Sequence, residues 1–240
     1  MTEKYTCQIN KHQNFEVKLQ EGVFRPTGTS DEIIKAVSEN IASPGRILDL
    51  GCGSGVVGFA LHILGKSNDT LYASDLSSNA VLLIKENANT LSIPVDSRQG
   101  SIFEPWENES FDYIIDDISG IAEKVAEISP WFSKTSCRSG EDGTDLVIEA
   151  IIRAPEHLNN AGKFFFPVLS LSNTEKIIDT ANTIFTKVTK VAQKEWRLPD
   201  EMKEHIDVLI DLKSKGLISF EEKYGWLLWS TEIYMAESPK

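Results

Sequence analysis

The sequence is poor in the residues that build metal sites and disulfide frameworks. It contains three cysteines, Cys7, Cys52 and Cys137, and four histidines that lie far apart along the chain. Their spacing matches no metal-ligand pattern, and the odd number of cysteines does not suggest a disulfide scaffold. We therefore expect neither a metal site nor disulfide bonds.

Long apolar runs and positive charge are also scarce. No run reaches the length that a membrane span requires, and residues 1–13 lack the apolar core of a signal peptide. The 24 Lys and Arg residues are scattered and are outnumbered by 36 Asp and Glu residues, which gives a net charge of -12. Such a charge opposes binding to a polyanion. These absences predict a cytoplasmic protein with no membrane partner and no nucleic-acid partner, and they leave its oligomeric state open.

What the sequence does contain is an alternation of short apolar runs with longer helical patterns. The 240 residues, 41% of them hydrophobic, suffice for one well-buried domain. Short extended pieces over 5–24 and a helix over 31–41 form an N-terminal cap segment, which we assign to residues 1–43. From residue 44 to 240 the alternation predicts an α/β domain, a parallel sheet with helices on both faces. The predicted helices span 56–65, 78–91, 145–158, 173–186 and 201–215, and the tail 224–237 reads as a final, antiparallel strand.

A glycine-rich turn follows the first strand of this domain. The stretch "ILDLGCGSGVVGFAL" has glycines at positions 51, 53, 55 and 58, and the missing side chains allow the turn to approach a ligand closely. Together with Asp75, the last three also satisfy the G-x-G-x-x-G pattern of dinucleotide-binding proteins. Asp49, placed at the strand end just before the first glycine, distinguishes the stretch from that pattern.

The segment "LDLGCGSG" resembles the first motif of class I S-adenosylmethionine-dependent methyltransferases. The resemblance implies a Rossmann-like, doubly wound, mostly parallel seven-stranded sheet and S-adenosyl-L-methionine as cofactor. Asp75 would accept hydrogen bonds from both ribose hydroxyls, although an Asp before a helix can also be a helix cap. Ser101 and Ile102 stand where the family often places a Gly-Asp pair near the adenine. The cofactor-binding residues predicted in this way are Thr29, Ser30, Asp49, Gly51, Cys52, Gly53, Gly55, Asp75, Leu76, Ser101, Ile102 and Asp116.

Further segments resemble the small-domain group of these enzymes, which includes the release-factor glutamine methyltransferases. "EGVFRPTGTSDEII" is similar to their entry segment, in which a hydroxyl residue, here Thr29 or Ser30, contacts the cofactor. Capping of the following helix by Ser30 would explain the same residues without a ligand. "RSGEDGTDLVIEAIIRAPEHLNNAGKFFF" resembles their later loop, helix and fifth strand, so the likeness covers nearly the whole chain.

The chain departs from this group at the end of the fourth strand. N-methylating relatives carry Asn-Pro-Pro-Tyr there, which holds a planar amide or an exocyclic amine against an aromatic ring. This chain has Asp117, Ile118, Ser119 and Gly120 instead. We predict Asp117 and Ser119 as catalytic residues, because the Asp117 carboxylate can accept a proton from the acceptor or hold an ammonium group near the sulfonium. Alternatively, Asp116 and Asp117 only end the strand and cap the next helix.

The lost motif shapes the functional expectation. Without its ring and rigid turn, a flat amide or a flipped base loses its stacking partner. We therefore expect a biosynthetic methyltransferase that acts on a small molecule or a peptide, and not on a planar amide or nucleobase, with Trp131 and Phe132 walling the acceptor pocket. Two alternatives are a cyclase that releases methylthioadenosine from the cofactor and a partner subunit without catalysis. A dinucleotide oxidoreductase is disfavoured, because the sequence has no Tyr-x-x-x-Lys pair.

Overall fold

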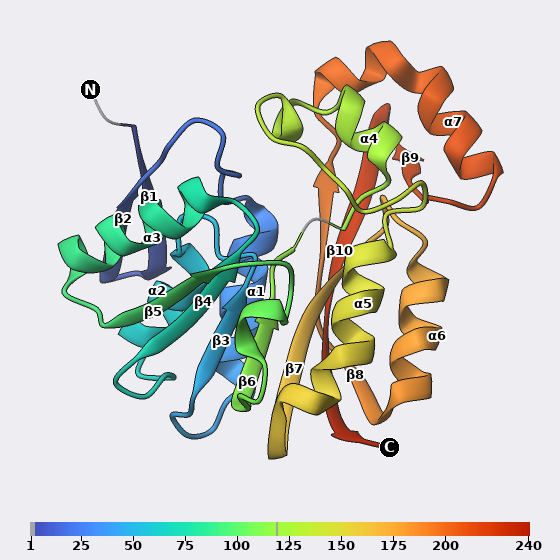
Figure 1. Ribbon diagram of the computed structural model, residues 1–240. Coiled ribbons are helices and arrows are strands. Elements are labelled where there is room, and N and C mark those ends of the chain that lie inside the picture. Colours follow the sequence, from blue (N-terminus) through green and yellow to red (C-terminus); the bar gives the residue numbers. More distant parts are fainter. Residues whose placement is uncertain (1–2, 119) are drawn as a thin grey trace.

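A mixed β-sheet forms the centre of the computed structural model, which describes residues 3–118 and 120–240 (Figure 1). The strand order is β5-β4-β3-β6-β7-β10-β8, and the short strand β9 pairs with β10. The neighbours from β5 to β7 are parallel, and β10 is antiparallel to both β7 and β8, which confirms the predicted α/β class and the antiparallel last strand. The strands are β3 (Ile47–Leu50), β4 (Leu71–Asp75), β5 (Val95–Gln99), β6 (Phe111–Asp116), β7 (Leu158–Leu169), β8 (Phe185–Arg197), β9 (Glu221–Lys223) and β10 (Trp226–Pro239).

Helices cover both faces of the sheet, because successive strand residues point to opposite sides. Ile47 of β3 and Phe165 of β7 belong to a core shared with α1, α2 and α3. Leu48 and Phe164, their neighbours in sequence, belong to a second core shared with α5 and α6. The helices are α1 (Gly28–Asn40), α2 (Val56–Ile63), α3 (Ser78–Leu91), α4 (Glu123–Ile128), α5 (Asp145–Arg153), α6 (Thr174–Ile184) and α7 (Ile206–Ser214), with short 3-10 turns η1 (Glu104–Trp106), η2 (Pro130–Phe132), η3 (Ala154–His157) and η4 (Asp200–His205).

The N-terminal segment forms a hairpin and leads into α1. Strands β1 (Lys4–Asn10) and β2 (Gln13–Lys18) make a separate two-stranded sheet, and Cys7, Phe15 and Val17 pack into the core beneath α1 and α2. Helix α1 starts earlier than its apolar pattern predicted, because the Thr27 side chain caps it by accepting a hydrogen bond from the backbone N–H of Thr29. Ser30 is therefore not the N-cap, and its hydroxyl is free for another contact. The division at residue 43 stays a prediction.

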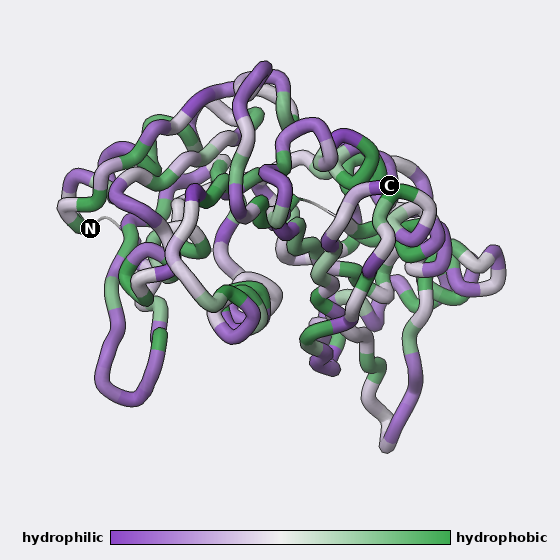
Figure 2. Tube along the Cα trace, turned by 90° about the horizontal axis from the view of Figure 1, so that it is seen from below, coloured by the Kyte–Doolittle hydropathy of each residue, from purple (hydrophilic) through white to green (hydrophobic). Residues whose placement is uncertain are grey.

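A third core lies at the carboxyl ends of the strands, around α4, α7 and β9 (Figure 1). We call residues 121–137 and 198–229 the α4–α7 cluster. Its buried members include Val125, Leu209, Leu212 and Trp229, which pack on the end of β7 through Leu169. Hydrophilic stretches mark the protruding loops in Figure 2. No helix within 3–118 or 120–240 combines the length and apolarity of a membrane span.

Candidate functional site

The glycine-rich turn links β3 to α2 and requires glycine at several positions. Gly51, Gly53 and Gly55 have φ angles of +73°, +50° and +86°, in the left-handed region that other residues avoid. A Cβ on Gly51 would lie 3.1 Å from the Ile118 side chain, so the turn also passes close to the loop after β6. Gly58 differs, because a Cβ there would press on Leu71 in the core. The first three glycines therefore shape the turn, and the fourth serves helix packing.

Asp75 at the end of β4 faces this turn. Its Oδ2 accepts a hydrogen bond from the Gly53 N–H at 3.0 Å, and its Oδ1 accepts one from the Ser77 N–H at 2.8 Å. Helix α3 is capped by the Ser77 side chain, so Asp75 is not the N-cap. Burial raises the pKa of Asp75, while its two backbone hydrogen bonds lower it. The turn and the start of α3 therefore hold the Asp75 carboxylate in place beside the cavity.

The neighbouring wall is apolar and strained. Leu76 is 57% exposed, which is high for a large aliphatic side chain and leaves a flat apolar surface beside Asp75. Ile102 is buried at a φ of +48°, an unfavourable conformation for a β-branched residue. Both residues line the same cavity as Ser101. The strained backbone at Ile102 and the exposed Leu76 side chain thus lie at the place where the sequence predicts the adenine contact, which stays a prediction.

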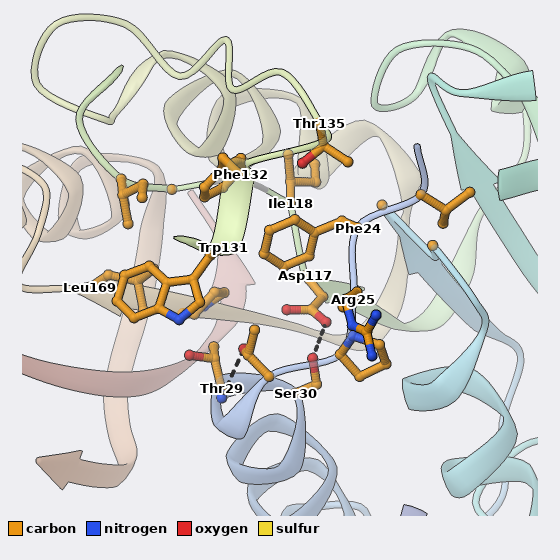
Figure 3. Close-up of a pocket in the computed structure, with 18 of the residues that line it drawn as sticks. Phe24, Arg25, Thr29, Ser30, Asp117, Ile118, Trp131, Phe132, Thr135 and Leu169 are labelled. Atoms are coloured by element: carbon orange, nitrogen blue, oxygen red, sulfur yellow. Dashed lines mark hydrogen bonds between the residues drawn. The ribbon is translucent and has the colours of Figure 1, made fainter. Parts of the chain in front are cut away.

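Asp117 follows β6 and lies on the opposite side of the turn. The Ser30 hydroxyl donates a hydrogen bond to its Oδ2 at 2.9 Å (Figure 3). Burial raises the pKa of Asp117 from 3.8 to about 7, with Asp31 adding to the shift and Ser30 opposing it. The carboxyl is half-buried and lines the cavity. It can therefore exchange a proton near neutral pH.

Two further acids lie behind the cavity. Asp49 has an exposed fraction of 0%, its Oδ2 accepts from the Gly58 N–H at 3.0 Å, and burial raises its pKa to about 8. Asp116 is 1% exposed, its Oδ1 accepts from the Ile118 N–H at 2.9 Å, and burial raises its pKa to about 7. Helix α4 has Ala122 at its N-cap position, so the capping alternative for Asp116 and Asp117 is excluded.

One cavity of about 1100 Å³ joins the two sides of the site. Three adjacent strands, β4, β3 and β6, deliver Asp75, Gly51 and Asp117 to the same edge of the sheet, where open α/β sheets bind ligands. Asp49, Gly55 and Asp116 do not line the cavity, and Ser119 lies outside the described residues. The predicted residues that line it are Thr29, Ser30, Gly51, Cys52, Gly53, Asp75, Leu76, Ser101, Ile102 and Asp117.

Aromatic rings form the wall around Asp117. The predicted pair, Trp131 and Phe132 of η2, does line the cavity (Figure 3). Sequence reasoning missed the others, Phe24, Trp196, Trp226 and Trp229, which come from the N-terminal segment and from β8 and β10. Trp131 lies 5.3 Å from Trp229 between ring centroids, and Trp196 lies 6.4 Å from Trp229. Trp131, Trp229 and Trp196 thus form a row of neighbouring rings that come from distant parts of the chain.

The N-terminal segment bridges the mouth of the cavity. Phe24 packs on Phe132 with ring centroids 4.9 Å apart, and Lys134 forms an ion pair with Glu21 at 3.1 Å. The Phe24 carbonyl also lies over Gly53, where a Cβ would be 3.5 Å from it. This bridge, residues 21–24 on one side and 132–134 on the other, connects the glycine-rich turn with the α4–α7 cluster.

Comparison with known proteins agrees with this geometry. A family model described as "Methyltransferase small domain" matches residues 14–117. A release factor glutamine methyltransferase from Enterococcus faecalis is 25% identical over 149 residues, which cover 60% of this chain and 53% of that protein. A ribosomal protein L11 methyltransferase from Staphylococcus saprophyticus is 28% identical over 174 residues, which cover 70% of this chain and 53% of that protein.

Among solved structures, the T. thermophilus 16S rRNA N2 G1207 methyltransferase in complex with AdoMet and guanosine superimposes with a TM-score of 0.65. It is 14% identical, and the match covers 98% of this chain and 50% of that chain, so it supports the fold. The chain spans about half the length of all these relatives. The predicted resemblance to class I methyltransferases of the small-domain group is confirmed, with the family match confined to residues 14–117.

The predictions about the acceptor and its partners need correction. The relatives are named for a release factor glutamine, a ribosomal protein and a base of ribosomal RNA. Three predictions are therefore wrong. They are the restriction of the acceptor to a small molecule or peptide, the exclusion of a planar amide or nucleobase, and the exclusion of nucleic acid. The inference from the missing ring at Gly120 was incomplete, because Trp131, Phe132 and Trp196 line the same cavity from other elements.

The exclusion of nucleic acid also failed for an electrostatic reason. A net charge of -12 is a sum over the whole chain and does not describe the surface of one cavity. Four cationic side chains line this cavity although basic residues are in the minority: Arg25, Lys134, Arg138 and Arg197. Arg25 and Lys134 form ion pairs with Glu3 and Glu21, and Asp75 and Asp117 line the same cavity, so both signs of charge meet there.

Proposed function

We propose that this chain is an S-adenosylmethionine-dependent methyltransferase that methylates a nitrogen in a planar group of a protein or an RNA. The observation that carries the proposal is the single cavity that runs from Asp75 and the glycine-rich turn to Asp117 and its aromatic wall. The confirmed family resemblance and the relatives named above support both the cofactor and the kind of acceptor in this proposal. A protein acceptor takes precedence, because the curated relatives by sequence act on proteins by name.

The cofactor half has the features that an adenosine sulfonium needs. We propose that Asp75 binds the ribose hydroxyls, that Leu76 and Ile102 contact the adenine, and that the turn at Gly51 and Gly53 accommodates the methionine part. Asp49, Asp75, Asp116 and Asp117 lie around this region with pKa values that burial raises, and a bound sulfonium cation would lower these pKa values and favour the carboxylate forms. S-Adenosylmethionine supplies a methyl group that the positive sulfur already activates.

The acceptor half would act mainly by positioning. Flat rings such as Trp131 and Trp196 would align a planar group, and in-line placement supplies much of the acceleration in a transfer of this kind. In the transfer, the S–CH₃ bond breaks as the N–CH₃ bond forms, sulfur keeps the bonding electron pair, and the nitrogen becomes positive. We propose that the Asp117 carboxylate takes the proton that this nitrogen loses.

An RNA base is a second candidate acceptor. The row of rings formed by Trp131, Trp229 and Trp196 favours it, because bases stack on aromatic side chains. Arg138 and Arg197 at the cavity would then face phosphate groups. The cytoplasmic location predicted from the sequence would suit either acceptor.

A transfer assay with three acceptors tests the proposal. Purified protein is incubated with methyl-labelled S-adenosylmethionine and with a release factor, ribosomal protein L11 or unmethylated 16S rRNA, and S-adenosylhomocysteine is counted by mass spectrometry. We expect one acceptor to gain label in equal amount to the S-adenosylhomocysteine formed, and Asp117→Asn to reduce this at least tenfold with cofactor still bound. If S-adenosylmethionine does not bind at millimolar concentration, the proposal fails. Release of methylthioadenosine instead would overturn methyl transfer.

A further inference from the structure

Two side chains in the first turn of helix α1, Thr29 and Ser30, make contacts on the acceptor side of the cavity. Ser30 is 3% exposed and donates its hydroxyl hydrogen to Asp117 at 2.9 Å. A serine hydroxyl has a single hydrogen to donate. As long as this bond holds, Ser30 cannot also donate to a cofactor carboxylate. The earlier cap at Thr27 makes this arrangement possible, since it relieves Ser30 of the capping role.

Thr29 makes a second link to the same side. Its Oγ1 lies 3.2 Å from Oγ1 of Thr231 on β10, and the Trp196 indole N–H donates to that same Thr231 oxygen at 3.0 Å. Thr29 and Thr231 are 8% and 1% exposed, so both hydroxyls depend on these partners. The chain of hydrogen bonds fixes the orientation of the Trp196 ring.

Gly28 completes the contact between α1 and Trp196. A Cβ on Gly28 would overlap the six-membered ring of the indole, with Cζ3 only 2.6 Å away. The φ angle of Gly28 is not in the left-handed region, so close approach is the reason for glycine here. The indole therefore lies directly against the helix start, and any larger residue would push it into the cavity or out of it.

We propose that the first turn of α1 is a positioning element for the acceptor: Ser30 orients the Asp117 carboxylate, and Thr29 with Thr231 fixes the Trp196 ring. This assignment rests on the proposed function, and it differs from the sequence-based prediction that Thr29 and Ser30 bind the cofactor. Orientation matters because a carboxylate that accepts a proton and a ring that aligns a planar group both act through geometry. Thr29 and Ser30 would then determine turnover and not cofactor affinity.

The Ser30 branch is tested by following Asp117 directly. In protein labelled with ¹³C at the aspartate carboxyls, Asp117→Asn identifies the Asp117 signal, and its titration is compared in wild type, Ser30→Ala and Ser30→Thr. Loss of the hydrogen bond should raise the Asp117 midpoint by about 1 pH unit, and threonine should restore it. Three other carboxyls interact electrostatically with Asp117 and can change its titration: Asp31 on α1, Asp49 on β3 and Asp116 on β6. All three are kept in every variant.

Cofactor affinity separates the two assignments. At pH 9, where Asp117 is ionised in all variants, calorimetry should give S-adenosylmethionine dissociation constants within twofold for wild type and Ser30→Ala. If Ser30→Ala binds S-adenosylmethionine at least tenfold more weakly than wild type and leaves the Asp117 titration unchanged, the proposal is overturned and Ser30 is assigned to the cofactor. If Ser30→Ala does not fold, Ser30→Cys, with its weaker donor, serves in the same comparison. Failure of wild type to bind the cofactor would refute the proposed function and leave the titration readable.

The Trp196 branch is tested through the indole N–H signals in ¹⁵N-labelled protein. Trp196→Phe identifies the Trp196 signal, and we expect Thr231→Val to shift it and to speed its exchange with solvent, while Thr231→Ser leaves it in place. The Trp106 signal is the internal control, because that indole N–H has no hydrogen-bond partner in the part of the chain that the structure describes. An unchanged Trp196 signal in Thr231→Val would refute the link.

Discussion

Replacing Asp117 by asparagine should stabilise the cofactor-free protein, and the gain should grow as the pH rises from acidic to alkaline. Burial raises the pKa of Asp117 from 3.8 to about 7 in the folded chain. Well below its ordinary pKa of 3.8, this carboxyl is protonated whether the chain is folded or not. As the pH rises toward 7 the unfolded chain loses the proton first, so stability falls, and the loss is complete above the folded pKa.

The size of this effect follows from the shift. About 3 pH units correspond to at most about 4 kcal/mol, and because solvent in the cavity reaches Asp117 we expect about 1–3 kcal/mol. Asparagine keeps an oxygen for the Ser30 hydroxyl and carries no charge. At pH 8.5 the variant should therefore melt about 3–10 °C above wild type, with a smaller difference at pH 5. Removing the Asp117 charge should add to this stabilisation through Asp49 and Asp116, because that charge contributes to the raised pKa of each.

Differential scanning calorimetry between pH 5 and pH 8.5 measures the difference. The control is Asp69→Asn, which removes the same charge from an exposed loop and should leave the melting temperature nearly unchanged. A gap between variant and wild type that stays constant with pH, or a variant that melts lower at pH 8.5, would refute the reasoning that burial strains this carboxylate.

Three further predictions concern the turn, the ribose contact and the bridge across the cavity mouth. Asp75→Ala should weaken S-adenosylmethionine binding by about 1.5–3 kcal/mol in calorimetry while circular dichroism shows an intact fold, and unchanged affinity would exclude the ribose role. Gly65→Ala should lower the free energy of unfolding in urea by about 1–2 kcal/mol, because Gly65 has a left-handed φ but a Cβ there would meet no neighbouring atom. Gly55→Ala should lower it at least twice as much, because a Cβ on Gly55 would also press on Phe59. Equal losses in the two variants would contradict the packing argument. Phe132→Ala should speed cofactor dissociation several-fold in stopped-flow fluorescence by releasing Phe24, and an unchanged rate would show that this contact does not retain the cofactor.

The glycine-rich turn and the strand end at Asp75, which we propose to hold the cofactor, could be placed beside one cavity from the sequence because their signal is local. The turn from Gly51 to Gly55 and the strand end at Asp75 are short stretches whose residue types follow from backbone geometry. The strand and helix alternation that places them side by side is likewise a pattern of neighbouring residues. The antiparallel final strand was predictable for the same reason.

The acceptor half could not be predicted in this way. Trp196 and Trp229 lie on β8 and β10, far in sequence from Asp117, and nothing near either residue indicates that it faces a cavity. Gly120 has no ring, and local reasoning concluded that stacking was lost. The missing rings are supplied through tertiary packing, which a motif comparison at one position does not detect. The link from Ser30 to Asp117 spans 87 positions and escaped detection for the same reason.

The separate core of the α4–α7 cluster has a consequence for the cavity wall. Leu209 and Leu212 pack among themselves and against strand ends, apart from the two cores that hold the sheet and its helices together. Substitutions among its buried leucines could therefore change the part of the cavity wall that Trp131 and Trp229 form without disturbing the packing of the two sheet cores.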